Sequence, residues 1–355
     1  MAGSNDLGLD DLDRRGGEWL RGGGTRADIV ISSRVRLARN LAGFPFLARA
    51  SEEQREEIVE RVKVPFAKLP LETSPYYIDL AEAGETLGSF LVERHLISRE
   101  LQQGKGARGV AFGSNEAVSV MVNEEDHIRI QSIKTSLALG DAWQSALAID
   151  HALEDELDFA ASSRYGYLTA CPTNVGTGMR ASVMLHLPAM VQMKQIEKLF
   201  NAAHRTGLAV RGFYGEGTMA SGDLYQISNQ VTLGVDEEQI LEGLEAILPT
   251  ILDYERKCRD ELLTDRRQLQ VEDRCHRALA LLRSARILSS DEAMSNLSTV
   301  RLGMVTGVLS GVDVERVNEL FVLIQPAHVQ KMRGEDIDPP ARDALRAQYV
   351  RQNLS

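Results

Sequence analysis

The chain has 355 residues, of which 43% are hydrophobic and 26% charged, and its formal net charge is −11 at pH 7. This composition is typical of a globular protein with two domains that each bury a core. An acidic chain disfavours direct nucleic-acid binding, which needs a positive surface. Residues 1–24 lack the apolar core of a signal peptide and no apolar run is long enough to span a membrane, so we expect a cytoplasmic protein.

The three cysteines, Cys171, Cys258 and Cys275, are widely spaced, and no two of them form a CxxC pair. A disulfide framework or a structural zinc site is therefore not expected. Cys171 begins a glycine-rich loop, whereas the other two lie in segments with helical periodicity.

In chain order, residues 1–25 predict a flexible lead with a glycine hinge at 22–24. Ser51 and Gln54 have the spacing of a capping box, which predicts a helix that extends to about residue 69. The next segments predict a strand, a helix, three β-branched strands and a helix, over 76–80, 87–97, 108–112, 118–122, 127–133 and 137–157.

Two further strands are predicted over 208–214 and 223–233. Consecutive strands with short turns favour a mainly antiparallel sheet flanked by helices. The rest of the chain predicts helices over 236–268, 270–287, 290–310, 312–331 and 340–353. We therefore expect an α+β fold, with a sheet domain over 26–255 and an all-helical domain over 256–355.

The segment from Cys171 to Arg180 combines a nucleophilic residue, a turn, small residues and a cation. Its proline and asparagine favour a turn, and Gly176 and Gly178 permit close approach of the backbone to a ligand. The apolar run 181–190 predicts a helix, which would place Arg180 in the first helical turn. Because that position favours anions, a cation there indicates an anionic partner.

Arginines recur in three other segments. In Ser32-Ser33-Arg34-Val35-Arg36 both arginines would project to one face of a strand, which fits either a solvated edge strand or an anion site. Residues 123–129, NEEDHIR, fit either an acidic surface turn or a carboxylate in a cleft with Arg129 directed at phosphate. Residues 211–217, RGFYGEG, fit either a hairpin turn or a glutamate held against a ligand.

Together these arginines form a set of cations that needs a polyanion: Arg34, Arg36, Arg129, Arg180 and Arg211. Arginine binds phosphate oxygens through its planar fork, so a nucleoside triphosphate with Mg²⁺ would satisfy the set. The sequence contains no GxxxxGK[ST] motif and no HRD or DFG element. Phosphoryl transfer would therefore depend on a cradle of arginines.

The segments SSRVR, NEEDHIR, CPTNVGT with its following arginine, RGFYGEG and DLYQISNQVTLG together resemble the guanidino-phosphotransferases over roughly residues 28–250. Only a short lead precedes SSRVR and a helical part follows the sheet, which resembles the bacterial protein-arginine kinases. Residues 342–347, RDALRA, match the RDxxRA element with which those enzymes bind phosphoarginine.

The resemblance implies that Glu125 and Glu216 grip the substrate guanidinium and that Cys171 is the active-site cysteine. His95 resembles a nucleotide-contacting histidine, although a capping or packing role fits a lone histidine equally well. An allosteric phosphoarginine site is implied at Arg342, Asp343, Arg346 and Ala347. ATP contacts are implied at Ser32, Ser33, Arg34, Val35, Arg36, His95, Arg129, Arg180, Ala181, Ser182, Val183, Met184, Arg211, Gly212, Phe213, Tyr214, Gly215 and Glu216.

The function that the resemblance implies is ATP-dependent phosphorylation of arginine side chains in proteins, with Mg²⁺ held mainly by ATP. The relatives mark proteins for a Clp-type chaperone and protease in the stress response, act with an activator protein, and are commonly homodimers. Two alternatives are a small-molecule guanidino kinase and a non-catalytic phosphoarginine-binding adaptor. The short lead argues against the first, and the retained glutamates and arginines argue against the second.

Overall fold

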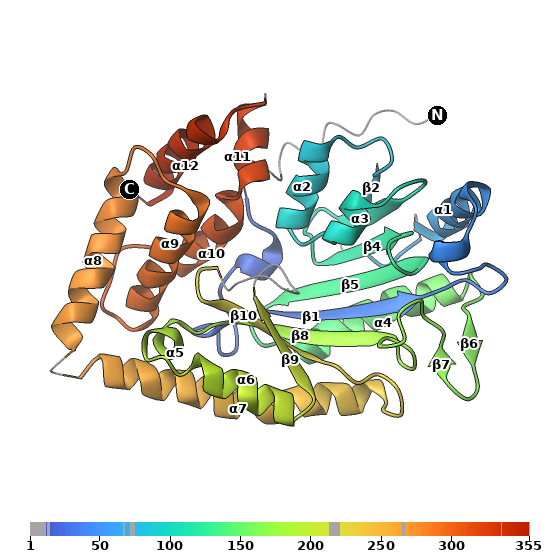
Figure 1. The fold of residues 1–355 in the computed structure, drawn as a ribbon, viewed down its shortest axis with the longest axis horizontal. Helices are drawn as coiled ribbons and strands as arrows, with labels where there is room; N and C mark the ends of the chain where they lie inside the picture. The colour runs from blue at the N-terminus through green and yellow to red at the C-terminus, as the bar shows by residue number, and fades with distance from the viewer. Residues whose placement is uncertain are drawn as a thin grey trace.

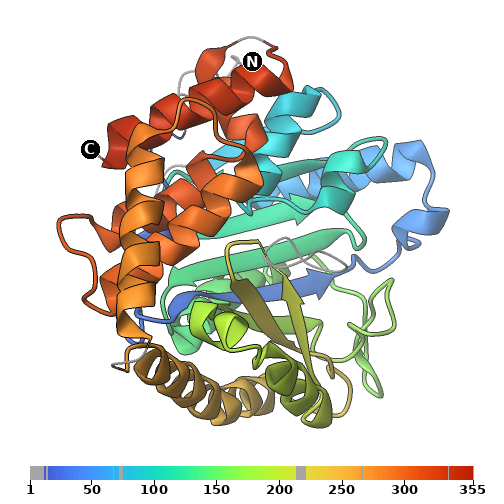
Figure 2. The same ribbon diagram turned by 60° about the vertical axis from the view of Figure 1, so that its left-hand side comes forward.

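The computed structural model describes residues 12, 15–66, 68–71, 75–212, 221–264, 267–334 and 336–354. A large sheet lies at the centre, and the carboxy-terminal helices stack against one end of it (Figure 1). Turning the molecule shows these helices as a layer beside the sheet, close to α2 near the amino-terminal half (Figure 2). The expected α+β architecture is therefore confirmed.

Eight strands form one sheet in the order β2-β3-β4-β5-β1-β8-β10-β9, and every neighbouring pair is antiparallel. A separate hairpin, β6 (Ala161–Ser162) and β7 (Gly166–Tyr167), lies near the end of β1. The strands of the large sheet are β1 (Val30–Arg39), β2 (Pro75–Asp79), β3 (Gly109–Gly113), β4 (Val118–Val122), β5 (Ile128–Thr135), β8 (Met179–His186), β9 (Leu208–Gly212) and β10 (Leu224–Asn229).

Helix α4 (Leu139–Glu154) packs on β5, β1 and β8 and buries one face of the sheet centre. Ala142 and Ala146 of this helix share a hydrophobic core with Val35 and Val183 of the strands. Because side chains alternate along a strand, Arg34 and Arg36 project from the opposite face. The other elements of this part are α1 (Glu52–Phe66), α2 (Glu85–Glu93), α3 (Arg99–Gln103), α5 (Pro188–Gln192), α6 (Ile196–Arg205) and the 3-10 turns Glu18–Leu20 and Leu47–Arg49.

The expected capping box at the start of α1 is present. The Ser51 backbone N–H donates to Gln54 Oε1 at 3.0 Å, and the Gln54 backbone N–H donates to Ser51 Oγ at 3.3 Å. Each side chain satisfies a backbone donor that the first turn of a helix leaves unpaired.

The remaining chain is helical, with α7 (Glu237–Leu262), α8 (Gln268–Ser284), α9 (Ser290–Val305), α10 (Val314–Leu323), α11 (Pro326–Arg333) and α12 (Pro339–Leu354). The prediction of one helix over 312–331 was wrong, because α10 ends before Pro326 and α11 begins there. Proline cannot donate a hydrogen bond to the preceding turn, and it suits the first position of a helix.

Part of the amino-terminal lead is buried in the described structure. Trp19 is 2% exposed and Leu20 is 1% exposed, and both belong to the main hydrophobic core. The Leu20 carbonyl accepts a hydrogen bond from Asn318 Nδ2 of α10 at 3.2 Å. This segment therefore lies between the sheet and the helices, where burial of an aromatic ring fixes it.

The expected domain boundary at 255/256 falls inside α7, which is continuous to Leu262. Glu255 accepts hydrogen bonds from the backbone N–H groups of Ala189 and Met190, and Arg259 donates to the carbonyl of Asp28. Helix α7 is thus bound to the sheet part on both sides of the expected boundary, and α8 to α12 form the helical layer.

Candidate functional site

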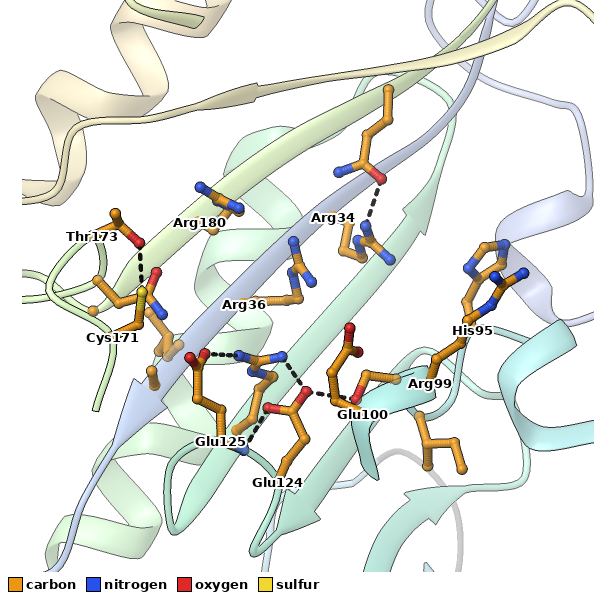
Figure 3. Close-up of a pocket in the computed structure, with 18 of the residues that line it drawn as sticks. Arg34, Arg36, His95, Arg99, Glu100, Glu124, Glu125, Cys171, Thr173 and Arg180 are labelled. Atoms are coloured by element: carbon orange, nitrogen blue, oxygen red, sulfur yellow. Dashed lines mark hydrogen bonds and ion pairs between the residues drawn. The ribbon is translucent and has the colours of Figure 1, made fainter. Parts of the chain in front are cut away.

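A cavity of about 450 Å³ opens on the face of the sheet opposite α4 (Figure 3). Residues from distant parts of the sequence meet in it. Its lining includes Arg34, Arg36, His95, Ser98, Arg99, Glu100, Glu124, Glu125, Arg129, Cys171, Thr173, Asn174, Arg180, Arg211 and Gln226.

All five arginines of the predicted set line this cavity, and they come from four strands of one sheet. Strand register explains why they meet. Arg36 of β1 lies directly opposite Arg180 of β8. Arg129 lies on β5, on the other side of β1, and Arg211 lies on β9 beside β10. The alternating pattern of each strand therefore directs the guanidinium groups to one face.

The concentration of positive charge is unfavourable within the protein itself. Burial, followed by repulsion from Arg129, Arg180 and Arg211, lowers the pKa of Arg34 to about 10. Burial and repulsion from neighbouring arginines also lower the pKa of Arg36 well below its usual value. Arg34 Nη2 donates to Gln226 Oε1 at 2.6 Å, a neutral acceptor that does not compensate charge. An anion in the cavity would relieve this repulsion.

Arg36 Nε is buried and has no hydrogen-bond partner among the described residues. A buried donor without a partner costs free energy, so a bound group that accepts its hydrogen bond is favoured. Phosphate oxygens are suitable acceptors for such a guanidinium fork. The arginine set therefore fits a nucleoside triphosphate.

His95 lies in the wall of the cavity, next to the turn that follows α2 (Figure 3). Its ring packs edge-on against Trp19, with 5.4 Å between ring centroids. Burial, together with the charges of Arg34 and Arg36, lowers the pKa of His95 to about 3. The imidazole is therefore neutral at physiological pH and adds no charge to the arginine set.

Two adjacent glutamates occupy different environments in the cavity. The Glu124 side chain is 1% exposed, and its Oε1 accepts from Ser98 Oγ at 2.5 Å and from Arg129 Nη1 at 2.6 Å. The Glu125 side chain is 44% exposed and has a longer contact of 3.4 Å with Arg129 Nη2. Desolvation raises the pKa of Glu125. Glu124 is thus held by the protein, whereas Glu125 offers its carboxylate to the cavity.

Cys171 is partly exposed at the cavity, with its Sγ 3.0 Å from Thr173 Oγ1. The loop that carries it is fixed from the other side by Thr232, whose hydroxyl lies 2.9 Å from the Thr173 carbonyl and 2.8 Å from the Val175 carbonyl. The thiol is therefore held in a loop with a defined conformation.

The glycines of this loop serve a different purpose from the one expected. Gly176 has φ of 113°, and a Cβ there would lie 2.1 Å from the Thr232 carbonyl oxygen. Gly178 has φ of 65°, and a Cβ there would lie 2.6 Å from the Ala38 carbonyl oxygen. Both positions require glycine because another part of the backbone approaches closely.

The predicted helix over 181–190 was wrong. Met179–His186 is strand β8, covered on both faces, and a short helix begins only at Pro188. A strand that is buried on both faces forms a continuous apolar run, which periodicity does not distinguish from a buried helix. Arg180 of β8 therefore lies opposite Arg36 of the neighbouring strand β1, and not at a helix N-terminus.

The other predicted nucleotide residues fall into three groups. Ser32, Ser182 and Met184 line a small hollow that shares Arg34 and His95 with the main cavity. Ser33, Val35, Ala181, Val183 and Gly212 are buried, and the Ser33 hydroxyl donates to the Ser136 carbonyl at 2.8 Å. Phe213, Tyr214, Gly215 and Glu216 lie outside the described residues.

Comparison with known proteins agrees with this geometry. Residues 57–258 match the family described as ATP:guanido phosphotransferase, C-terminal catalytic domain, and residues 268–355 match the protein-arginine kinase McsB C-terminal domain. The protein-arginine kinase of Symbiobacterium thermophilum is 46% identical over 98% of this chain and 100% of its own length. That of Moorella thermoacetica is 47% identical over 96% and 98%. The chain belongs to the protein-arginine kinase family.

Solved guanidino kinases share the fold over about two thirds of this chain. A duplicated taurocyamine kinase from Schistosoma mansoni with bound transition state analog components has a TM-score of 0.60 and 28% identity, covering 68% of this chain and 34% of that one. Lombricine kinase has a TM-score of 0.58 and 25% identity, covering 66% and 68%. The protein is thus an enzyme of a phosphotransferase family.

Several lining residues of this protein-arginine kinase family member were not predicted. Ser98, Arg99 and Glu100 follow α2, and Gln226 lies on β10 beside Arg211. Gln226 belongs to the DLYQISN segment, which signalled the family but not a role for this side chain. The segment 98–100 carries no motif, so only the fold brings it to the cavity.

The RDxxRA residues lie on α12, and none of them lines the cavity. Arg346 and Ala347 are buried, and Arg346 donates to the carbonyls of Ile324 and Leu288 at 2.7 and 2.8 Å and to Asp343 Oδ1 at 2.5 Å. Arg342 is partly exposed and donates to Gln330 Oε1 of α11 at 3.2 Å. Arg346 therefore holds helices together, and Arg342 and Asp343 are the accessible members of the set.

Across the described residues, no three His, Cys, Asp or Glu side chains are grouped so that they could hold a metal ion. Within the same part of the chain, no helix is both long enough and apolar enough to cross a membrane.

Proposed function

We propose that the protein transfers the γ-phosphate of ATP to arginine side chains of proteins. The observation that carries this proposal is one cavity in which five arginines from four strands lie beside Glu124, Glu125 and Cys171. Arginines that repel one another suit a triphosphate, and the accessible carboxylate of Glu125 suits a second, incoming guanidinium. The similarity of the chain to protein-arginine kinases supports the same reaction.

The arginine set would hold the triphosphate and compensate the charge that develops on the transferring group. Phosphoryl transfer needs little covalent help from the protein, so positioning and charge stabilisation supply most of the catalysis. Mg²⁺ bound by the nucleotide phosphates would neutralise part of their charge. Glu124 is already bound to Arg129 and Ser98, and it would keep Arg129 in place.

Glu125 would grip the substrate guanidinium and accept a proton as nitrogen attacks the γ-phosphorus, while the bond from that phosphorus to the bridging oxygen breaks and ADP leaves. A protonated guanidinium is a poor nucleophile with a pKa above about 12, so a carboxylate at the attacking nitrogen is required. The raised pKa of Glu125 makes it a better base than an exposed carboxylate. Glu216, the second expected carboxylate, lies outside the described residues. Cys171 would lie against the bound guanidinium and tune its charge.

The test is phosphoryl transfer to two acceptors. The protein is incubated with Mg²⁺ and ATP together with either a denatured protein or free arginine, and acid-labile phosphate on nitrogen is followed by ³¹P NMR. We expect a signal with the protein acceptor. A signal with free arginine alone would indicate a small-molecule guanidino kinase, and no signal with either acceptor would contradict the proposal.

A Glu125→Gln variant tests the base. Turnover should fall by about two to four orders of magnitude, because the amide cannot accept the proton, while nucleotide affinity stays nearly constant. A Glu100→Gln variant is a matched control, since Glu100 lines the same cavity. Normal turnover of Glu125→Gln would remove the proposed role.

Regulation forms a separate part of this proposal. Phosphoarginine would bind near Arg342 and Asp343 of a helical regulatory domain and bias activity, while residues 26–255 carry catalysis. An activator protein, a Clp-type chaperone and protease, a role in the stress response, a cytoplasmic location and a homodimer are further predictions from the family. Calorimetric titration of phosphoarginine into Arg342→Ala tests the regulatory site, and undiminished binding would exclude it.

A further inference from the structure

Helix α2 ends in a buried contact with helix α11 of the carboxy-terminal layer, and this contact lies two residues before His95. Glu93 Oε1 accepts the backbone N–H of Ala327 at 2.8 Å, and Glu93 Oε2 accepts that of His328 at 2.9 Å. His328 Nδ1 also lies 2.8 Å from Glu93 Oε2. One carboxyl group therefore binds both the first turn of α11 and a side chain of that helix.

Arg94, the next residue, extends the contact in three directions. Its guanidinium pairs with Glu116 in the β3–β4 turn, and both side chains are at most 2% exposed. Arg94 Nη1 lies 3.2 Å from His328 Nε2 and donates to the Leu12 carbonyl at 2.8 Å. The end of α2 is thus fixed to the helical layer, to the sheet and to the amino-terminal segment.

His95 follows in a backbone conformation that few side chains adopt. Its φ is 59°, in the left-handed region, and its N–H donates to the Val92 carbonyl while that of Leu96 donates to the Leu91 carbonyl. This is the helix end at which glycine is usual, because a Cβ is unfavourable in this conformation. Such a conformation persists only where the surroundings fix it, and it often marks a functional site.

The surroundings of His95 supply that restraint from several sides. Its carbonyl accepts a hydrogen bond from Gln131 Nε2 of β5 at 2.6 Å, and its ring packs against Trp19. On the preceding side, Glu93 and Arg94 bind α11. On the following side, Ile97, Ser98 and Arg99 continue the wall of the arginine cavity.

We propose that the contact of Glu93 with His328 positions His95 and the adjoining cavity wall for nucleotide binding, so that α11 of the helical layer is part of the nucleotide site. Glu93 and His328 are positioning residues, since neither lines the cavity. The inference rests on the proposed binding of nucleotide among the arginines. It adds that nucleotide binding also requires the helical layer.

The test compares affinity for Mg·ADP, measured by calorimetry on the full chain, in four variants. His328→Ala and Glu93→Gln should each weaken binding by about tenfold, because a displaced cavity wall no longer fits the ligand. His328→Asn should recover most of the affinity, since its amide can replace Nδ1 as a donor to Glu93. Thermal unfolding of each variant identifies those that fold.

Arg256→Ala is the matched control. Arg256 of α7 forms a two-point ion pair with Asp28, at 3.0 and 3.1 Å, and it also joins distant parts of the chain but does not touch α2. Its affinity for Mg·ADP should equal that of the wild type. The proposal would be overturned if Arg256→Ala weakened Mg·ADP binding as much as the Glu93 and His328 variants do. It would also be overturned if the affinity of Glu93→Gln stayed within twofold of the wild type.

If His328→Ala does not fold, the Mg·ADP affinity of Glu93→Gln alone tests the proposal. If the wild type itself fails to bind Mg·ADP, the proposed function fails and this inference fails with it. If the wild type binds and Glu93→Gln binds equally well, only this inference is lost.

Discussion

The partly buried arginines of the cavity and the buried arginines of the helical layer differ in their hydrogen-bond partners. In the cavity, Arg34 and Arg36 face other arginines, and Arg36 Nε has no partner among the described residues. In the helical layer, Arg301 donates to Asn318 Oδ1 at 2.8 Å and to the carbonyls of Ala27 and Asp28 at 2.8 and 3.2 Å. Arg346 is likewise bound to two carbonyls and a carboxylate.

This difference distinguishes two uses of the same residue. A buried guanidinium whose donors are all directed at acceptors stabilises the contact between helices, and its removal leaves those acceptors unsatisfied. Guanidinium groups that converge and repel one another raise the free energy of the empty protein and favour a bound anion. Burial alone therefore does not identify an arginine that stabilises the fold. Its hydrogen-bond partners must also be known.

The largest expected effect comes from removing a cavity arginine. Arg36→Gln should lower kcat/KM by about 10³-fold, since arginines that contact a transferring phosphoryl group contribute about that much. Its melting temperature should stay the same or rise, because a repulsive charge is lost. Steady-state kinetics and calorimetry measure both, with the exposed Arg61→Gln as the control.

A fall in melting temperature of Arg36→Gln by several degrees would contradict this view. It would mean that Arg36 stabilises the fold, as the arginines of the helical layer do.

The helical layer should respond in the opposite way. Arg346→Met should lower the free energy of unfolding by about 3 kcal/mol, because the carbonyls of Ile324 and Leu288 and the Asp343 carboxylate lose their donor. Urea unfolding measures this loss. Arg342→Met, on the same helix and partly exposed, should lose less than about 1 kcal/mol. Equal losses for the two variants would remove the distinction between them.

A further expected effect is a dependence of stability on pH at Glu93. Burial outweighs its hydrogen bonds and raises the pKa of Glu93 to about 8. Since the folded pKa lies above the unfolded value of about 4.3, folding takes up a proton between these values. The stabilisation from this group is complete below about pH 4 and is lost as pH rises through about 8, with a slope of at most about 1.4 kcal/mol per pH unit.

Comparison of the wild type with Glu93→Gln isolates this contribution. Urea unfolding between pH 5 and 8, roughly the window between the two pKa values, should show a shallower slope for the variant. Identical slopes would mean that Glu93 does not exchange a proton on folding.

The sequence was sufficient to predict the antiparallel sheet, the helical layer and the convergence of five arginines on one cavity. It misplaced Arg180 because a strand covered on both faces has no polar alternation to separate it from a helix. It treated the segment before Arg26 as a flexible lead because a single tryptophan among glycines gives no periodic signal, although Trp19 is buried.

Other features depend on long-range contacts that no local pattern encodes. Glu93 and His328 are 235 residues apart, and neither belongs to a recognisable motif. Ser98 reaches the cavity as the N-cap of α3, and Gln226 reaches it from within β10, where it pairs with Arg211. Arg346 matched a binding motif in sequence, but the register of α12 against α8 and α11 turns its guanidinium into the interface.

The most direct measurement is a crystal structure of the protein with Mg·ADP. We expect both phosphates within hydrogen-bonding distance of Arg34, Arg36, Arg129, Arg180 or Arg211, with Glu125 facing the open end of the cavity. A nucleotide bound elsewhere on the molecule, or phosphates that contact none of these arginines, would contradict it.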